Sequence, residues 1–293
     1  ARTEYISCAA LDSTHFVVGF QDWDVLLGIC MIGVVTEDAI AYGSKYEFNA
    51  ADAAYVSCAA LDSTHFVVGF MDFGGDSYGI AMIGVVTGDV IAYGSEYEFN
   101  AANTFYVSCA ALDSNHFVVG FMDFGGDYYG IAMIGVVTGD VIAYGSEYEF
   151  NAADTEYVSC AALDSTHFVV GFMNYDVLLG ICMIGVVTGD VIAYGSEYEF
   201  NAVETAFVSC ARLDDTHFVV GFMDFGGDFY GIAMIGVVTG DAIAYGSEYE
   251  FNAARSDDVS CARLDDTHFV VGFMDYGGDS YGIAMIGTFP LEV

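Results

Sequence analysis

The chain has 293 residues, of which 55% are hydrophobic and 16% aromatic, yet 42 Asp and Glu against 5 Lys and Arg give a formal charge of −37. The aromatic and apolar content excludes a disordered chain, because such chains lack the apolar surface that offsets the entropy of ordering. The charge argues against nucleic acid, which needs clustered Lys and Arg, and the longest apolar runs, 25–35 and 177–187, are shorter than the about 18 residues of a membrane span.

The sequence consists of six copies of one unit. The segment Ser-Cys-Ala-Ala-Leu-Asp-Ser-Thr-His-Phe-Val-Val-Gly-Phe recurs with few changes, and its cysteines are spaced by 50 or 51 residues. These cysteines are Cys8, Cys58, Cys109, Cys160, Cys210 and Cys261. Repeats of about 40–50 residues that each supply four antiparallel strands are typical of a β-propeller, whereas the rungs of a β-helix are roughly half as long.

We therefore predict an all-β fold, a six-bladed β-propeller with four antiparallel strands per blade. It is expected to be a single domain over residues 1–293, with blades at about 1–50, 51–101, 102–152, 153–202, 203–253 and 254–293.

The second unit illustrates the four strands that we expect. Residues 55–61, 65–71 and 78–86 form the first three, and the second and third of these are continuously apolar, as in strands buried on both faces. The fourth, 90–99, alternates, with Tyr93, Ser95, Tyr97 and Phe99 on one side and Glu96, Glu98 and Asn100 on the other. This pattern predicts an outer strand with one side in water, where the glutamates prevent edge-to-edge pairing.

The sixth unit ends without the Tyr-Gly-Ser-Glu-Tyr-Glu-Phe strand of the other five. We expect Thr288 to Val293 to supply a short substitute strand near the N-terminal blade. Pro290 is acceptable there because an edge strand can spare a hydrogen-bond donor.

The units are of two types. Units 2, 3, 5 and 6 join their second and third strands through Asp-(Phe/Tyr)-Gly-Gly-Asp-x-Tyr-Gly, whereas units 1 and 4 have a turn that is one residue shorter and contains Val-Leu-Leu. The order is therefore ABBABB, which indicates duplication of a three-blade unit. The segments 25–27 and 177–179 are interpreted either as partner contacts or as covers for adjacent blades, and the second interpretation is favoured.

The cysteines are expected to be eight free, buried thiols that act as small apolar residues. Only units 1 and 4 carry the additional Cys30 and Cys182. Rotation about the propeller axis separates equivalent cysteines beyond the about 7 Å between Cα atoms that a disulfide permits. Cys8 is not expected to reach Cys30, because the first and third strands of a blade are not neighbours.

Each unit has one histidine at the start of its second strand. These are His15, His65, His116, His167, His217 and His268. They could form a ring of metal ligands or general bases, but the common Leu-Asp-x-(Thr/Asn)-His context favours imidazoles bonded to the preceding turn. No dense set of ligands at zinc-like spacing supports a metal, so none is assigned.

The turns between the second and third strands of the B-type units bring acids and a tyrosine together. A carboxylate beside an aromatic ring suits a sugar, whose hydroxyls need acceptors and whose C–H face stacks on rings. The candidate ligand-binding residues are Asp72, Asp76, Tyr78, Asp123, Asp127, Tyr129, Asp224, Asp228, Tyr230, Asp275, Asp279 and Tyr281. No cofactor is expected, although Ca²⁺ at these oxygen-rich turns is an alternative.

In its near-identical blades the sequence resembles the tandem-repeat β-propellers, including the propeller lectins of innate immunity and of fungi. That resemblance, together with identical sites that gain avidity by repetition, favours a multivalent binding protein for glycans or glycoproteins over an enzyme, whose site gathers different residues in distinct roles. Alternatives are an acidic structural or interaction protein that binds calcium, and a toxin or enzyme acting at a central channel. A mature, secreted protein is expected, and the oligomeric state is not predicted.

Overall fold

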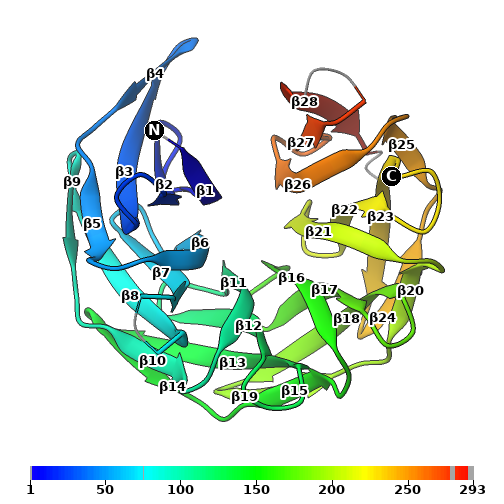
Figure 1. The fold of residues 1–293 in the computed structure, drawn as a ribbon, viewed down its shortest axis with the longest axis horizontal. Helices are drawn as coiled ribbons and strands as arrows, with labels where there is room; N and C mark the ends of the chain where they lie inside the picture. The colour runs from blue at the N-terminus through cyan, green and yellow to red at the C-terminus, as the bar shows by residue number, and fades with distance from the viewer. Residues whose placement is uncertain (1, 75, 278–280, 290–293) are drawn as a thin grey trace. The chain divides into compact units, whose positions relative to one another are not determined.

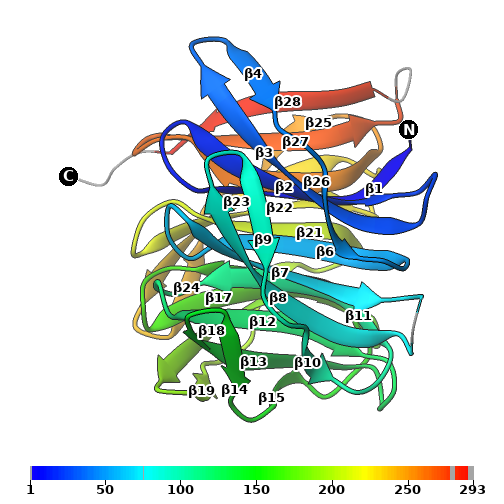
Figure 2. The same ribbon diagram turned by 90° about the vertical axis from the view of Figure 1, so that its left-hand side faces the viewer.

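The computed structural model describes residues 2–74, 76–277 and 281–289, and these ranges contain 28 β-strands and no helix (Figures 1 and 2). They therefore hold no helical segment with the length and apolar character that crossing a membrane would require. Two compact units can be distinguished, Ala1–Glu149 with Gly189–Val191, and Phe150–Thr188 with Ile192–Val293. Each is described by itself, and a single domain over the whole chain stays a prediction.

The strands follow the repeats. The first three repeats give β1 (Thr3–Ala10), β2 (His15–Asp22), β3 (Leu27–Thr36), β4 (Ala39–Tyr42), β5 (Tyr46–Asn49), β6 (Ala53–Ala60), β7 (His65–Asp72), β8 (Tyr78–Thr87), β9 (Val90–Tyr93), β10 (Tyr97–Asn100), β11 (Thr104–Ala111), β12 (His116–Asp123), β13 (Tyr129–Thr138), β14 (Val141–Tyr144) and β15 (Tyr148–Asn151). The last three give β16 (Thr155–Ala162), β17 (His167–Asn174), β18 (Leu179–Thr188), β19 (Val191–Tyr194), β20 (Tyr198–Asn201), β21 (Thr205–Arg212), β22 (His217–Asp224), β23 (Gly231–Thr239), β24 (Ala242–Tyr245), β25 (Tyr249–Asn252), β26 (Ser256–Arg263), β27 (His268–Asp275) and β28 (Tyr281–Thr288).

Each repeat forms one antiparallel sheet, whose strands we call a, b, c and d in chain order. In the second sheet β6, β7 and β8 are a, b and c, and they lie within two residues of the predicted ranges. Strands b and c are buried along almost their whole length, as their continuous apolar sequence predicts. Three of the four predicted strands are therefore confirmed as single elements.

Strand d lies where the sequence places it, but it is divided into β9 and β10, which both pair with β8. Tyr93 pairs with Gly84 and Tyr97 with Ala81, so four residues of strand d span three of β8. A second irregularity lies between Glu98 and Asn100. These bulges shift the alternation, because each extra residue moves the next side chain to the other face.

The predicted sidedness of strand d is therefore wrong. Tyr93 packs against Phe48 of the first sheet, whereas Phe99 contacts Phe121 of the third, so these two rings lie on opposite faces. Asn100 is buried rather than in water, and Ser95 is exposed rather than on the tyrosine side. The glutamates Glu96 and Glu98 are exposed, as predicted.

Within each unit, neighbouring sheets pack face to face around aromatic rings. In the second sheet Phe66 lies flat on Gly84, where an added Cβ would fall 2.2 Å from the ring. Phe99 of strand d lies on Gly79 and contacts Phe121 of the third sheet, with 5.0 Å between ring centroids. The same contact recurs between Phe48 and Phe70 in the first unit, and between Phe200 and Phe222 and between Phe251 and Phe273 in the second.

None of the eight cysteines forms a disulfide, as predicted, but only six are buried, since Cys8 is exposed and Cys261 is half-buried. Two pairs of thiols, which sequence reasoning did not consider, lie close together. An added Cβ at Gly19 would be 2.6 Å from the Sγ atom of Cys58 and 3.4 Å from that of Cys30, so both sulfurs flank one glycine. Their mutual hydrogen bond and burial raise the pKa of Cys58 well above its ordinary value.

The second pair has the same arrangement in the other unit. The sulfurs of Cys210 and Cys182 lie 2.6 and 3.3 Å from the corresponding Cβ position of Gly171. The additional cysteine of each A-type sheet thus meets the strand a cysteine of the following sheet.

The sixth sheet has three strands in the part of the chain that the structure describes, in the order β26-β27-β28. Thr288 does not begin a substitute strand, because it is the last residue of β28 and pairs with His268. Phe289 is buried, and its N–H donates to the Thr267 carbonyl at 3.0 Å. The remainder of the predicted substitute strand, 290–293 with Pro290, lies outside the described residues.

Candidate ligand-binding site

The turns between strands b and c, here the b–c turns, bring together the residues that the sequence nominates. Asp72 pairs with Tyr78 across the base of the second hairpin, and Asp123 pairs with Tyr129 in the third. In the fifth sheet the Asp224 N–H donates to the Tyr230 carbonyl at 2.9 Å. In the sixth sheet Asp275 pairs with Tyr281 across the base of the hairpin.

The first aspartate of each turn is held by the preceding sheet. The amide Nδ2 of Asn49 donates to Asp72 at 3.0 Å, and that of Asn100 donates to Asp123 at 3.2 Å. Asn201–Asp224 and Asn252–Asp275 repeat the contact, at 3.5 and 3.2 Å. These half-buried aspartates therefore connect neighbouring sheets, a role that sequence reasoning missed.

The same carboxylates also organise their own turns. The Oδ1 atom of Asp123 accepts the N–H of Gly125 at 3.0 Å, and Oδ1 of Asp275 accepts that of Gly277 at 2.8 Å. Among the described residues, no group of three or more His, Cys, Asp or Glu side chains is arranged to hold a metal ion. Calcium at these turns stays a prediction, which a shift of the melting temperature in millimolar Ca²⁺ would test.

The second acid of the turn is placed differently from the first. Asp76, Asp127 and Asp228 are exposed, whereas Asp279 lies outside the described residues. In the third sheet the negative charge of Asp127, together with its hydrogen bond to the tyrosine hydroxyl, raises the pKa of Tyr129. This turn therefore combines a carboxylate and a phenol, as the sequence predicts.

The b–c turns also expose an aromatic ring that sequence reasoning overlooked. The residue after the first Asp or Asn of the turn is aromatic and between 37% and 57% exposed in every sheet. These residues are Trp23, Phe73, Phe124, Tyr175, Phe225 and Tyr276. The signal was present in the sequence, because an aromatic residue follows an Asp or Asn at this point in all six repeats.

A second ring accompanies the first in two turns. Tyr128 is 40% exposed and lies edge-on to Phe124 at 4.6 Å, and Phe229 contacts Phe225 at 5.1 Å. Tyr128 and Phe229 have φ angles of +66° and +65°. Such left-handed backbone is unfavourable for aromatic residues, and strain of this kind is concentrated at functional sites.

In the first unit the rings continue along strand a of each sheet. Ring contacts with centroids 4.6 to 5.4 Å apart lead from Tyr128 through Phe124 and Phe105 to Tyr55. Tyr55 in turn contacts both Tyr5 and Tyr106. Tyr5, Tyr55 and Tyr106 occupy a bulge of strand a and have φ angles between +51° and +53°. We call this connected set of six rings the aromatic track.

The second unit places acids beside the corresponding rings. Tyr157 and Phe207 are in contact at 5.3 Å. Burial and the nearby charges of Asp154 and Glu204 raise the pKa of Glu156. Burial and the charge of Glu156 in turn raise the pKa of Tyr157 to about 12. Rings and carboxylates thus share the end of the sheet that carries the b–c turns.

The shorter turns of the A-type sheets expose apolar side chains. Val25 and Leu26 are 57% and 44% exposed, and Val177 and Leu178 are similar. The interpretation that these segments cover adjacent blades is wrong for these residues, since a covering side chain would be buried.

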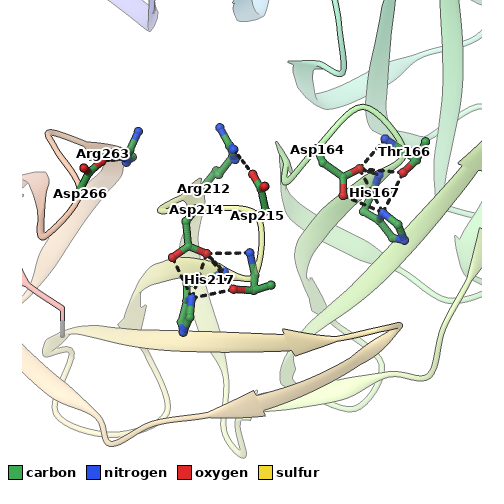
Figure 3. Close-up of polar contacts among 10 residues, drawn as sticks. Asp164, Thr166, His167, Arg212, Asp214, Asp215, His217, Arg263 and Asp266 are labelled. Atoms are coloured by element: carbon green, nitrogen blue, oxygen red, sulfur yellow. Dashed lines mark hydrogen bonds and ion pairs between the residues drawn. The ribbon is translucent and has the colours of Figure 1, made fainter. Parts of the chain in front are cut away.

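The histidines lie at the opposite end of each sheet, where each is the first residue of strand b, directly after the a–b turn. Figure 3 shows two of them, His167 and His217, with the aspartates of their turns. In each sheet the imidazole Nδ1 is 2.8 to 3.0 Å from a carboxylate oxygen of the preceding turn aspartate. The backbone N–H of Thr267 and the His268 imidazole lower the pKa of Asp265 to about 2. The structure thus shows the turn contact that the favoured interpretation of these histidines predicts.

Comparison with known proteins gives a fold but no family. No protein-family model matches the chain, and a search of curated proteins finds no match. Among solved structures, AofleA from Arthrobotrys oligospora is 9% identical with a TM-score of 0.65, covering 98% of this chain and 87% of its own. The Aleuria aurantia lectin, a fungal lectin described as six-bladed with a novel fucose recognition mode, is 12% identical with a TM-score of 0.60, covering 97% and 95%.

An enzyme has a similar fold. A Hadza microbial sialidase is 8% identical with a TM-score of 0.59, covering 93% of this chain and 63% of its own. These similarities and the repeated sheets show the predicted fold, an all-β six-bladed β-propeller with four-stranded antiparallel blades, the sixth being three-stranded within the described ranges. Each sheet is therefore one blade.

Proposed function

We propose that this protein is a multivalent carbohydrate-binding protein that holds sugars against the aromatic rings of its b–c turns. The observation that carries the proposal is the exposed ring in every blade, at the end of the sheet where carboxylates can accept hydroxyl hydrogen bonds. Equivalent weak sites on one molecule gain avidity when a glycan surface presents many sugars. The fucose-binding Aleuria aurantia lectin, with its similar fold, supports this proposal.

The charge distribution favours neutral over acidic sugars. All five cationic side chains are paired with carboxylates, in the ion pairs Arg2–Glu4, Lys45–Asp22, Arg212–Asp215, Arg255–Asp257 and Arg263–Asp266. No cation is therefore left to neutralise the carboxylate of an acidic sugar, and a chain of charge −37 repels it. We accordingly propose a binding protein and not a sialidase.

The test is binding of the full chain to an array of neutral and sialylated glycans, with and without Ca²⁺. We expect saturable binding to neutral glycans that is measurably weakened in the double variant F124A/Y128A, which removes the rings of one of the six turns, and unchanged in Tyr42→Ala. Tyr42 is a matched control because it is a 57% exposed aromatic residue on the outer strand β4, outside the b–c turns. No binding to any neutral glycan, or equal loss in both variants, would overturn the proposal.

A further inference from the structure

Strand c of the sixth blade, β28, presents an open edge. It pairs with β27 on one side, and within the described ranges no strand pairs with it on the other. Its Ile283 and Met285 are 39% and 44% exposed. The corresponding residues of β8 in the second blade, Ile80 and Met82, which pack in one cluster with Tyr93, are at most 8% exposed. A row of unpaired N–H and C=O groups of this kind is a template for another strand.

The second blade shows what covers this edge when it is occupied. Tyr93 of strand d pairs with Gly84 and directs its ring between Phe48 of the first blade and Phe66 of its own, each at 6.3 Å. Its hydroxyl donates to the Tyr46 carbonyl at 3.5 Å. The fifth blade repeats this geometry with Tyr245, which donates to the Tyr198 carbonyl at 3.4 Å.

Beside β28 a cavity of about 430 Å³ has the same lining without the tyrosine. Its walls include Tyr249, Phe251, Phe269, Met285 and Gly287. By repeat position these match Tyr46, Phe48, Phe66, Met82 and Gly84, which surround Tyr93 in the second blade. We call this cavity the tyrosine socket.

A second position on the edge matches the phenylalanine of strand d. An added Cβ at Gly79 would fall 2.3 Å from the ring of Phe99, and one at Gly231 would fall 2.1 Å from that of Phe251. At Gly282, the equivalent residue of β28, an added Cβ meets nothing within 4 Å. The edge therefore has room for both aromatic side chains of a strand d.

We propose that the β28 edge binds an extended polypeptide segment with the sequence of the repeat's own strand d, Ile-Ala-Tyr-Gly-Ser-Glu-Tyr-Glu-Phe-Asn. The segment pairs antiparallel with β28, its first tyrosine fills the tyrosine socket and donates to the Tyr249 carbonyl, and its phenylalanine lies over Gly282. Main-chain hydrogen bonds supply affinity and the two pockets supply specificity, as in other strand additions. This site goes beyond the proposed sugar binding, since its ligand is a polypeptide.

The test uses the full chain and a fluorescently labelled peptide of residues 90–100. We expect saturable binding by fluorescence anisotropy, and about tenfold weaker binding of the same peptide with alanine in place of Tyr93. Equal affinity for the two peptides would overturn the proposal. The absence of any binding would overturn it as well.

A chain variant tests the second position without disturbing the core. Gly282→Leu places a side chain in open space, so we expect an unchanged melting temperature. The variant should weaken binding of the 90–100 peptide but not binding of a peptide in which Phe99 is replaced by alanine. The reason is that the leucine competes only with the phenylalanine ring. Equal weakening of both peptides would contradict the assigned register.

Discussion

The two ends of each blade carry different chemistry. At the end with the a–b turns, aspartate oxygens are fully engaged: Oδ1 of Asp62 accepts the N–H of Thr64 at 2.6 Å and that of His65 at 2.8 Å. At the end with the b–c turns, a ring such as Phe124 is exposed, and Tyr128 beside it is held at positive φ.

The difference separates two kinds of repetition. The Asp–His pair satisfies the donors of its own turn, and such local side-chain bonds stabilise turns in any protein. The exposed rings leave apolar surface in water and strained backbone beside it, which does not stabilise the fold. A residue repeated in all six blades is therefore a candidate for ligand binding only where its side chain is exposed and does not stabilise its own turn.

The largest effect on stability is expected from Asn100, which joins two blades at the b–c end. Asn100 is buried and donates to Thr104 at 3.0 Å and to Asp123 at 3.2 Å. Asn100→Ala should lower the free energy of unfolding by about 2–3 kcal/mol, because the buried Thr104 hydroxyl and the half-buried Asp123 carboxylate both lose this donor. Urea denaturation measures this, with the exposed neighbour variant Glu98→Ala as control. A loss no larger than that of the control would show that the bond between blades is unimportant.

A smaller loss is expected at the a–b end. Asp113 accepts the N–H groups of Asn115 at 2.7 Å and His116 at 2.8 Å. Asp113→Ala should cost about 1–2 kcal/mol of unfolding free energy, as loss of a comparable cap does, while glycan affinity is unchanged. Asp113→Asn should recover much of the loss, because its amide oxygen can accept the same bonds. Reduced glycan binding in a folded Asp113→Ala would place ligand at the wrong end of the blade.

The exposed rings should show the reverse pattern. Phe124→Ala should lower the unfolding free energy by only about 1 kcal/mol, less than Asn100→Ala, because the half-exposed ring loses its contacts with Phe105 and Tyr128. The affinity of the third blade's b–c turn for sugar should fall by about 1 kcal/mol, or about fivefold, because one ring–sugar stack is lost. Calorimetric titration with a monovalent sugar measures this without avidity. A stability loss as large as that of Asn100→Ala would mean that the ring is structural.

The sequence predicts the strands of this protein better than their contacts. Strands a, b and c are specified by continuous or alternating apolar residues, which act locally. The local sequence does not specify the bulges that divide strand d, because Gly94 to Glu96 fit a regular outer strand equally well by composition. Their position depends on pairing with β8, and so Asn100 was assigned to the wrong face.

The site was predicted in part for the same reason. Asp72 and Tyr78 meet because a short hairpin must bring its ends together. The contact of Asp72 with Asn49 joins two sheets, and no local pattern requires it. A signal exists all the same, since the Asn and Asp of four such contacts are each separated by 23 residues.

The smallest effect tests the electrostatics of the a–b end. Although burial opposes it, the N–H of Thr64 and the His65 imidazole lower the pKa of Asp62 to about 2. Since an unfolded aspartate has a pKa of about 3.9, the folded state favours the ionised form. The resulting stability is present above pH 5 and is lost as the pH falls from about 4 to about 2. It should amount to less than about 1 kcal/mol, because solvent screens a side chain that is 41% exposed.

Asp62→Asn isolates this contribution, because the amide keeps the shape of the carboxylate but does not titrate in this range. The difference in unfolding free energy between the parent and Asp62→Asn should be constant from pH 7 to pH 5 and should shrink between pH 4 and pH 2. Urea midpoints at pH 7, 4 and 3 measure it, and the acid effects of the other carboxylates cancel between the two chains. A difference that grows as the pH falls would have the wrong sign and would show that the turn favours protonated Asp62.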